Sequence, residues 1–445
     1  MNASHRSMRN AQGYGRIRGS LLLLIFLVTV GLAAVCRGAT SAAPITPSAP
    51  IAFGTLQTEG EHAAEEYAGG VRIAMMEIFW DRYEPDKGRF SAAYAAEQRQ
   101  RLARLKAIGF RVTLALGAYD PPSWLAREPN AKFVNQNGAV SADLNYVFNQ
   151  KMRGYFERYL ARVDADLGLE NFWAIRITSG GNAELLYPGG GAYWAFDGNA
   201  QNGPDRPADL PRCPFPGWKP GHPGLSAAQV RRWADWYVLC LALTADWQMR
   251  ALDHFGFTGW RQILTPGSGA RPSVYEDAVN HRLPDGIVGV GAVWHKLYEF
   301  LPDKRRAVVY VSSVADLSGH DDVTQPEDGQ AALADPLANN WSATRWLVRI
   351  AHEYGLPVGG ENPGYNAPPS LNAHYVDSSP SGMMARSLAQ AEAGRFQCFY
   401  WAHSDRLWDG TKPFSEFASA IATANATAND RKGRRHLPAA LSHAR

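Results

Sequence analysis

The sequence predicts an α/β fold, a single (β/α)8 TIM barrel. Short apolar runs recur along the chain, and each ends at glycine, proline, asparagine or a cluster of aromatic and charged residues. Amphipathic segments separate these runs, and strands that alternate with helices favour a parallel sheet covered by helices. The eight runs, which is the number of strands that such a barrel requires, cover residues 51–55, 71–77, 110–116, 172–178, 261–264, 307–311, 357–360 and 396–400.

Two of the intervening segments carry clear helical patterns. One begins at Ser91, a residue suited to capping a helix, and ends at Gly109. In the other, apolar residues follow at spacings of three and four and make one apolar stripe: Met152, Tyr155, Phe156, Tyr159, Leu160 and Val163. The sixth strand has a competitor in residues 287–293, and we expect residues 307–311 to form it.

The N-terminal segment has the pattern of a secretory signal. Arg6, Arg9, Arg16 and Arg18 precede an apolar run over residues 21–35 and then a group of small residues. This run is shorter than the roughly 20 residues that span a bilayer, and a retained membrane anchor is the alternative to cleavage. The protein would then be secreted or periplasmic, and it would meet a membrane only through an uncleaved leader.

The sequence divides into four segments. We expect a signal peptide over residues 1–43, a linker over 44–50, a (β/α)8 barrel over 51–422 and a tail over 423–445. The tail is polar and basic, a composition typical of chain without stable structure.

Charge and cysteine content exclude several classes of protein. Lys and Arg number 45 and Asp and Glu 42, so the net charge of +3 gives no broad cationic face for nucleic acid. Cys213, Cys240 and Cys398 lie far apart, and the sequence has no CxxC or HExxH motif. The sequence therefore predicts no metal site and no cofactor, and at most one disulfide among these cysteines.

Two glutamates follow the fourth and seventh predicted strands. Glu184 lies in SGGNAELLYP, and Glu361 begins ENPGYN directly after GLPVGG. In a (β/α)8 barrel the functional groups lie at the carboxyl ends of the strands, and strands four and seven face each other across the mouth. Two carboxylates in one cleft suit cleavage of a glycosidic bond, in which one protonates the departing oxygen and the other attacks carbon or activates water. Surface or helix-capping carboxylates are the alternative interpretation.

Other residues at the strand exits are candidates for substrate binding. Sugar rings stack on aromatic side chains and their hydroxyl groups need polar partners. Trp80 and Trp401 are candidate stacking platforms, with core packing as the alternative, and Tyr310 is a candidate for orienting Glu361. The candidate hydroxyl partners are Glu77, Asp120, Asn182, His295, Asn362 and His403, of which the two histidines could equally be satisfied polar residues at the rim.

Several segments resemble families of carbohydrate-cleaving enzymes. VRIAMMEIFWDRYEPDKGRFS resembles the second-strand signature of family 42 glycoside hydrolases, the β-galactosidase type. The resemblance is continuous over residues 71–186, then thins until Gly359 and the eighth-strand motif CFYWAHSD. It implies a retaining barrel in which Glu184 is the acid/base and Glu361 the nucleophile. The family's asparagine before the acid is here Ala183, with Asn182 one place earlier. AELLYP and GENPGYN are also similar to the catalytic segments of family 14, the β-amylase type, which inverts.

The sequence therefore predicts a secreted glycoside hydrolase that cleaves an oligo- or polysaccharide by double displacement. Glu361 would form a glycosyl-enzyme, and Glu184 would first donate and then accept a proton. Because Glu184 must be protonated at rest, we expect its pKa to be raised by proximity to anionic Glu361. An inverting hydrolase with the same two glutamates and a non-catalytic saccharide-binding barrel are the alternatives.

Overall fold

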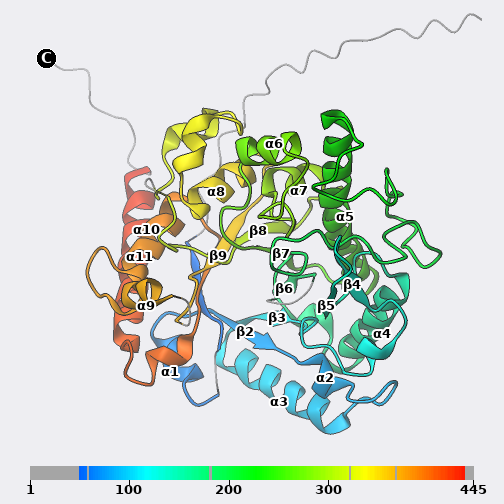
Figure 1. Ribbon diagram of the computed structural model, residues 1–445. Helices are drawn as coiled ribbons and strands as arrows, with labels where there is room; N and C mark the ends of the chain where they lie inside the picture. The colour runs from blue at the N-terminus through cyan, green and yellow to red at the C-terminus, as the bar shows by residue number, and fades with distance from the viewer. Residues whose placement is uncertain (1–49, 58–59, 180–182, 320–321, 366–367, 436–445) are drawn as a thin grey trace, which may run out of the picture. The chain divides into compact units, whose positions relative to one another are not determined.

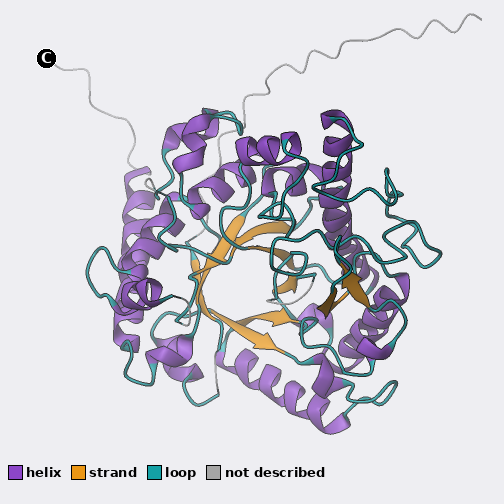
Figure 2. Cartoon of the chain, in the orientation of Figure 1, coloured by secondary structure: helices purple, strands orange, loops and turns teal. Residues whose placement is uncertain are grey.

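The computed structural model describes residues 50–57, 60–179, 183–319, 322–365 and 368–435. Within them, eight parallel strands close into a barrel surrounded by helices, which confirms the predicted fold class (Figure 1, Figure 2). Around the barrel the strands follow the order β1-β10-β9-β8-β7-β6-β3-β2. The strands are β1 (Ala52–Thr55), β2 (Ile73–Glu77), β3 (Arg111–Ala115), β6 (Ala174–Ile177), β7 (Trp260–Thr265), β8 (Ala307–Val311), β9 (Val358–Glu361) and β10 (Cys398–Trp401).

Each predicted apolar run overlaps one of these strands. Strands in a parallel barrel are buried on both faces, and for this reason they appear in the sequence as short continuous apolar runs. The sixth strand is β8, as expected. The competing residues 287–293 form turns and irregular structure before α7.

Helices connect the strands on the outside of the barrel. They are α1 (Ala63–Ala68), α2 (Trp80–Tyr83), α3 (Ala92–Ile108), α4 (Gln150–Leu167), α5 (Ala227–His254), α6 (Pro272–Asn280), α7 (Trp294–Phe300), α8 (Ala343–Glu353), α9 (Pro369–Val376), α10 (Met383–Ala393) and α11 (Phe414–Arg435). Short 3-10 turns are η1 (Leu125–Arg127), η2 (Leu169–Asn171), η3 (Pro326–Gln330), η4 (Pro336–Asn340) and η5 (Ser404–Leu407).

The helix patterns of the sequence have the expected physical basis. The Ser91 side chain accepts a hydrogen bond from the backbone N–H of Tyr94 and caps α3, and Gly109 ends that helix with a φ of 112°. In α4 the predicted apolar stripe is buried, and Asn149 caps the first turn. Both helices therefore begin and end where capping residues allow it.

A two-stranded hairpin that the sequence analysis did not identify extends the loop after β3. It consists of β4 (Lys132–Val134) and β5 (Val140–Leu144). Gln136, at its tip, donates from Nε2 to Asp285 at 2.7 Å and accepts from the N–H of Tyr193 at 2.8 Å. The hairpin is thereby tied to the loops that follow β6 and α6.

The barrel interior is closed by polar and aromatic side chains. The hydroxyl of Tyr400 lies 2.6 Å from Thr113 Oγ1 and accepts a hydrogen bond from Gln262 at 3.3 Å, so β10, β3 and β7 are linked across the interior. A Cβ at Gly54 would lie 2.6 Å from the Tyr400 ring. Only glycine leaves room for the tyrosine at this point of β1.

The segment expected to be a tail is partly helical, which corrects that prediction. α11 continues beyond residue 422 to Arg435. Its alanine-rich sequence has a high helix propensity, which outweighs the polar composition. Residues 436–445, the predicted signal peptide and nearly all of the linker lie outside the described residues.

Two further findings concern the described part of the chain. Cys213, Cys240 and Cys398 are buried free thiols. In the ranges given above, we find no helix that combines the length and apolar character needed to cross a membrane.

Candidate active site

The two predicted carboxyl groups lie at the carboxyl end of the barrel. Glu361 is the last residue of β9, and Glu184 lies in the loop after β6. That loop folds back on the strand end, because the Ser179 N–H donates to the carbonyl oxygen of Glu184 at 3.0 Å and Ser179 Oγ donates to that of Leu186 at 2.6 Å. β7 and β8 separate the two strands, so the glutamates approach the mouth from different sides.

Glu361 is held by an arginine and a tyrosine from two neighbouring strands. Its carboxylate forms an ion pair with Arg176 of β6, and its Oε2 accepts a hydrogen bond from the Tyr310 hydroxyl of β8 at 2.6 Å. Arg176 also donates to the Tyr310 hydroxyl at 2.7 Å. Burial alone would lower the pKa of Arg176, but the charge and hydrogen bond of Glu361 outweigh it and raise that pKa. Arg176 therefore places a buried cation directly against the carboxyl group of Glu361.

Glu184 lies in a different environment. It is half-buried, and its Oε1 accepts a hydrogen bond from Ser312 Oγ at 2.7 Å. Burial raises the pKa of Glu184 to about 7, the Ser312 hydrogen bond acts in the opposite direction, and the charge of Glu361 raises it further. We expected Glu361 to be the cause of the raised pKa, but burial contributes more.

The two environments separate the two glutamates chemically. At neutral pH Glu184 exists in both protonation states and can donate or accept a proton. Glu361 is instead held by the Arg176 cation and the Tyr310 hydroxyl. Carboxyl groups in one cleft whose environments differ in this way have the properties of an acid and a nucleophile or base.

Glu77 and Asp120 bring two more carboxyl groups to the same end of the barrel. Glu77 ends β2, and Asp120 lies in the loop after β3. Burial raises the pKa of Glu77, and the charges of Arg176 and Glu361 act on it in opposite directions. Burial also raises the pKa of Asp120. The interaction of Glu77 with Arg176, Asp120 and Glu361 places it with the other carboxyl groups at the mouth.

Trp401 and Trp80 are fully buried, which corrects the prediction that they are stacking platforms. Trp401 packs against Tyr375 of α9 and Phe417 of α11, and its Nε1 donates to the Tyr375 hydroxyl at 2.7 Å. Trp80 stacks on Tyr159 of α4 with ring centroids 4.6 Å apart. Neither indole has a face available to a sugar, because Trp401 packs outward against α9 and α11, and Trp80, the first residue of α2, packs against α4.

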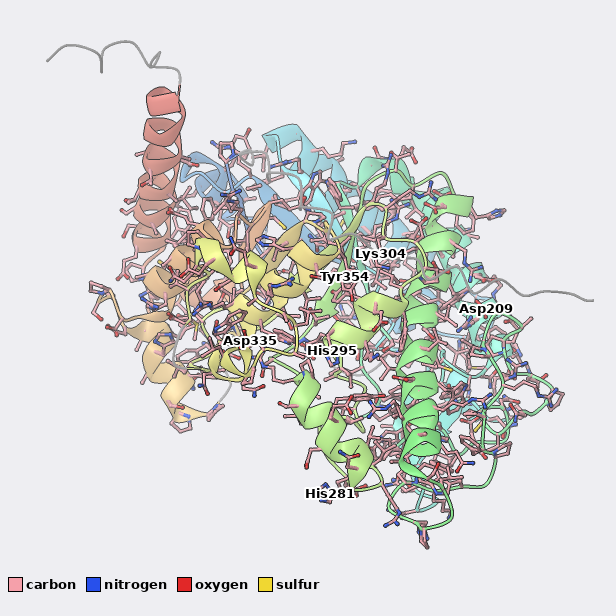
Figure 3. All side chains as sticks on the ribbon, turned by 90° about the horizontal axis from the view of Figure 1, so that it is seen from above. Asp209, His281, His295, Lys304, Asp335 and Tyr354 are labelled. Carbon is pink, nitrogen blue, oxygen red and sulfur yellow. The ribbon has the colours of Figure 1, made fainter. Side chains whose placement is uncertain are left out.

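His295 lies among helices, away from the two glutamates, which corrects its expected contact with a sugar. Its ring lies 6.0 Å from that of Tyr275 in α6 and 6.4 Å from that of Trp346 in α8. Figure 3 shows it beside Tyr354, whose hydroxyl donates to the His295 carbonyl oxygen at 3.3 Å. Burial lowers the pKa of His295 to about 4, so the ring is neutral at physiological pH.

His403 and Asn362 follow β10 and β9, but their side chains hold the backbone. His403 Nδ1 accepts a hydrogen bond from the N–H of Tyr365 at 3.1 Å, and burial lowers the pKa of His403. Asn362 is buried, and its Oδ1 accepts from the N–H of Ala402 at 2.7 Å. For Asn362 this corrects the expected contact with substrate. Asn182 lies outside the described residues.

Sequence reasoning missed Arg176 and Ser312. Arg176 is a charged residue within the apolar run of the fourth strand, and a lone arginine inside a barrel strand signals a buried partner of opposite charge. Ser312 directly follows the sixth strand, but nothing in its sequence context distinguishes it from Ser313. Tyr310 was identified, and its hydroxyl lies where we expected, on Glu361.

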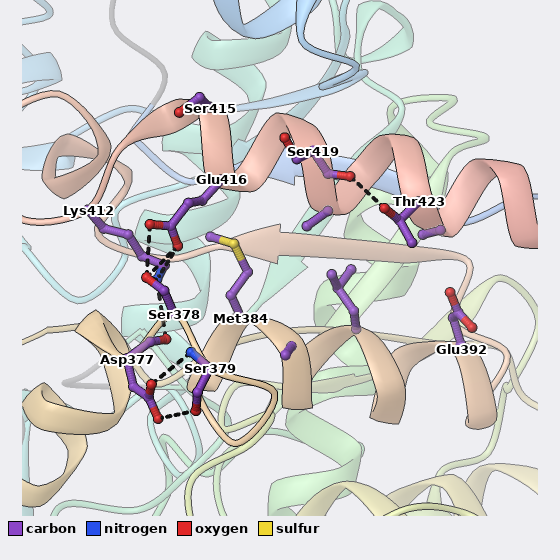
Figure 4. Close-up of a pocket in the computed structure, with 14 residues that line it drawn as sticks. Asp377, Ser378, Ser379, Met384, Glu392, Lys412, Ser415, Glu416, Ser419 and Thr423 are labelled. Atoms are coloured by element: carbon purple, nitrogen blue, oxygen red, sulfur yellow. Dashed lines mark hydrogen bonds and ion pairs between the residues drawn. The ribbon is translucent and has the colours of Figure 1, made fainter.

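A second concave region lies on the outside of the barrel. The groove between α10 and α11 has a volume of about 500 Å³ (Figure 4). At one end, Lys412 is buried and forms an ion pair with Glu416 at 2.8 Å. The groove lacks the two glutamates and belongs to a different face. In the part of the chain that the structure covers, no group of three or more His, Cys, Asp or Glu residues could hold a metal ion.

The fold and the site define a (β/α)8 barrel with two carboxyl groups in different environments at its mouth, and solved structures resemble that fold. The catalytic domain of β-amylase from Paenibacillus polymyxa matches with a TM-score of 0.53 and 13% identity, over 84% of this chain and 97% of that chain. A β-galactosidase from the psychrophilic Marinomonas ef1 matches with a TM-score of 0.49 and 14% identity, over 86% of this chain and 60% of that chain. A broad-specificity endoglucanase from an uncultured bacterium gives a TM-score of 0.41 and 14% identity, over 84% and 93%.

The β-amylase catalytic domain, which is matched over almost its whole length, is of the enzyme type that AELLYP and GENPGYN resemble. No protein-family model and no curated protein sequence matches the chain. At identities this low, the likeness shows the barrel fold.

Proposed function

We propose that this protein is a secreted glycoside hydrolase with Glu184 as the proton donor and Glu361 as its anionic partner. One observation carries the proposal: the two carboxyl groups share one barrel mouth, yet burial raises the pKa of Glu184 to about 7 while Arg176 pairs with Glu361. Cleavage of a glycosidic bond requires this combination of a protonated and an ionised carboxyl group. The β-amylase catalytic domain with the same fold is a further support.

The mechanism that we propose is retaining. Glu361 attacks the anomeric carbon while Glu184 protonates the departing oxygen, and a covalent glycosyl-enzyme forms. Water then enters, Glu184 accepts its proton, and the ester to Glu361 is broken. Tyr310 and Arg176 stabilise the leaving carboxylate in this second step, because both contact Glu361 Oε2.

An inverting mechanism with the same residues is the second candidate. It is favoured by the similarity of AELLYP and GENPGYN to the segments of β-amylases. Here Glu361 would activate water instead of attacking carbon, and a single displacement would invert the anomeric configuration.

The proposed substrate is a neutral saccharide. Glu77, Asp120 and Glu361 give the mouth an acidic character, and Arg176 is engaged by Glu361. An acidic mouth repels uronic or sulfated sugars, whereas sugar hydroxyls can donate to its carboxylates.

The test is hydrolysis of a panel of aryl glycosides by the full chain, with the anomer of the first product read by proton NMR. We expect the substrate's own configuration to be kept. Glu184→Gln and Glu361→Gln should each lose activity while Glu97→Gln, an exposed glutamate of α3, should not. An inverted product would replace the retaining mechanism. If the wild type and both variants bind saccharides but hydrolyse none, a non-catalytic saccharide-binding barrel is favoured.

A further inference from the structure

A pocket lies next to the segment after β8 that is hydrogen-bonded to the end of β9, the strand that carries Glu361. It has a volume of about 290 Å³ and is formed by residues that follow β8, together with side chains of α9 and α10. The N–H of Val314 donates to the carbonyl oxygen of Glu361 at 2.8 Å, and Ala315, the next residue, already lines the pocket. We call it the β8–β9 pocket.

The polar groups of the β8–β9 pocket cancel in charge. Asp322 and Arg386 form an ion pair, with Arg386 Nε at 2.8 Å from Asp322 Oδ2. Burial lowers the pKa of His374, which keeps its ring neutral at physiological pH. A site whose ionic groups are already paired suits a neutral ligand better than an ion.

Donors and acceptors of several kinds line the same space. Gln390 accepts from the N–H of Ala315 at 3.0 Å and donates to Asp322 at 3.3 Å. The segment that follows β8 and the Asp322–Arg386 ion pair are therefore fixed to each other. Ser381, in the turn that precedes α10, adds an exposed hydroxyl group. Such a mixture of rigid planar groups and a hydroxyl can satisfy the alternating hydroxyls of a sugar ring.

Leu317 supplies an apolar surface at the same place. Its side chain is 56% exposed, and its backbone takes a left-handed φ of 64°. Ala315 also has a positive φ of 61°, and the Asp316 carboxylate fixes the turn by accepting from the N–H of Ser318 at 3.0 Å. Two strained non-glycine residues in one turn are typical of a segment shaped for binding.

We infer that the β8–β9 pocket is a subsite for a sugar unit of the substrate that lies away from the cleaved bond. The inference rests on the proposed function and extends it. It assigns the pocket to a neutral pyranose, whose aliphatic face would lie on Leu317 and whose hydroxyls would meet Ser381, Gln390 and the Asp322–Arg386 pair. Substrates longer than a single glycosyl residue would then gain binding energy that short ones lack.

The test compares long and short substrates for a variant that fills the pocket. In Ser381→Trp the indole would occupy the space of the sugar, and Ser419→Trp, at an exposed serine of the α10–α11 groove in Figure 4, is the matched control. The substrates are a 4-nitrophenyl monoglycoside and the tetrasaccharides maltotetraose, cellotetraose and β-1,4-galactotetraose. For the tetrasaccharide that the wild type cleaves, kcat/KM should fall about tenfold in Ser381→Trp, equal to about 1.4 kcal/mol. The monoglycoside should be hydrolysed at the wild-type rate by both variants.

Leu317→Ser is a second variant, which removes the apolar face without adding bulk. It should also lower kcat/KM on the tetrasaccharide and leave kcat/KM on the monoglycoside unchanged. Equal kcat/KM values on the tetrasaccharide for wild type, Ser381→Trp and Leu317→Ser would overturn the subsite. If the wild type cleaves nothing, the proposed function fails, and calorimetric binding of the same tetrasaccharides decides the pocket. Binding that Ser381→Trp weakens about tenfold supports it, and binding that is absent or unchanged overturns it.

Discussion

Tyr310 and Ser312 contact opposite members of the carboxyl pair. The Tyr310 hydroxyl donates to Glu361 at 2.6 Å, and the Ser312 hydroxyl donates to Glu184 at 2.7 Å. Residues two apart on a strand point to the same face, so β8 and its first following residue present both hydroxyls to the barrel mouth. One strand therefore sets the positions of the proton donor and of its anionic partner.

Removing the Ser312 hydroxyl should change the pH dependence of hydrolysis. The hydrogen bond from Ser312 favours the ionised form of Glu184, so its loss raises a pKa that is about 7 in the native protein. Because the proton donor must be protonated, activity falls as the pH rises through this pKa. In Ser312→Ala the alkaline limb of kcat/KM should move to higher pH, by about one pH unit for one charge-assisted hydrogen bond. Ser312→Thr, which keeps a hydroxyl, is the control, and identical limbs in all three proteins would refute the role.

Glu184→Ala should distinguish good from poor leaving groups. It should be slow on natural saccharides and much less impaired on activated aryl glycosides, which need little protonation to depart. Glu361→Ala should fail on both kinds of substrate. In a retaining enzyme azide should rescue Glu184→Ala and give a product with the substrate's own anomeric configuration. Rescue of Glu361→Ala instead would identify the inverting mechanism, and wild-type rates in both variants would remove the two carboxyl groups from catalysis.

Arg176→Met should destabilise the fold. Arg176 and Glu361 are 6% and 9% exposed, so the substitution would leave a buried carboxylate without its cation. Breaking a buried ion pair on one side costs about 3–5 kcal/mol. Urea unfolding should show this loss, and the double variant Arg176→Met/Glu361→Gln should recover part of it because the charge is gone. An unchanged free energy of unfolding in Arg176→Met would mean that the ion pair with Glu361 contributes nothing to stability.

Trp401→Ala should act on stability before it acts on sugar binding. The indole is fully buried against Tyr375 and Phe417, and loss of a buried tryptophan costs about 3–5 kcal/mol. Trp401→Phe should cost less because it keeps part of the packing. Normal unfolding of Trp401→Ala together with weaker saccharide binding would restore the stacking role that the sequence suggested.

The N-terminal segment, residues 1–43, predicts where the mature protein begins. If residues 1–43 are a cleaved signal, N-terminal sequencing of protein from the culture medium or periplasm should give a start between about Ala39 and Pro44. A chain that begins at Met1 in the soluble cytoplasmic fraction would contradict export. The same chain in the membrane fraction would identify the leader as an uncleaved anchor.

The strands of this barrel could be predicted because parallel strands bury both faces and leave an apolar run in the sequence. The same runs give little information about the direction of each side chain. On β10, Tyr400 points into the barrel to Thr113 and Gln262, and Trp401, the next residue, must point outward to the helices. A position at a strand end was therefore insufficient to predict that Trp401 stacks on a sugar. The alternation of side chains along β10 would have assigned Trp401 to the core between the barrel and the helices.

The two glutamates were found because strand exits are the functional positions of a barrel, but their partners were not. The contacts of Glu361 with Arg176 and of Glu184 with Ser312 join residues 185 and 128 positions apart in the chain. Contacts of this kind depend on the register between strands, which composition and periodicity do not encode. The hairpin of β4 and β5 was missed for a related reason, since strands of three and five residues produce too short an alternation to detect.

The barrel closes between its first and last strands, where Ala52 lies opposite Cys398 and Thr55 opposite Trp401. During synthesis, β1 can pair with β2 on one side only, because its other neighbour emerges from the ribosome hundreds of residues later. Contacts that join such distant parts of a chain form late and slowly. The barrel therefore cannot close before β10 has been synthesised, so every chain that ends before residue 398 lacks the strand that completes the ring of hydrogen bonds.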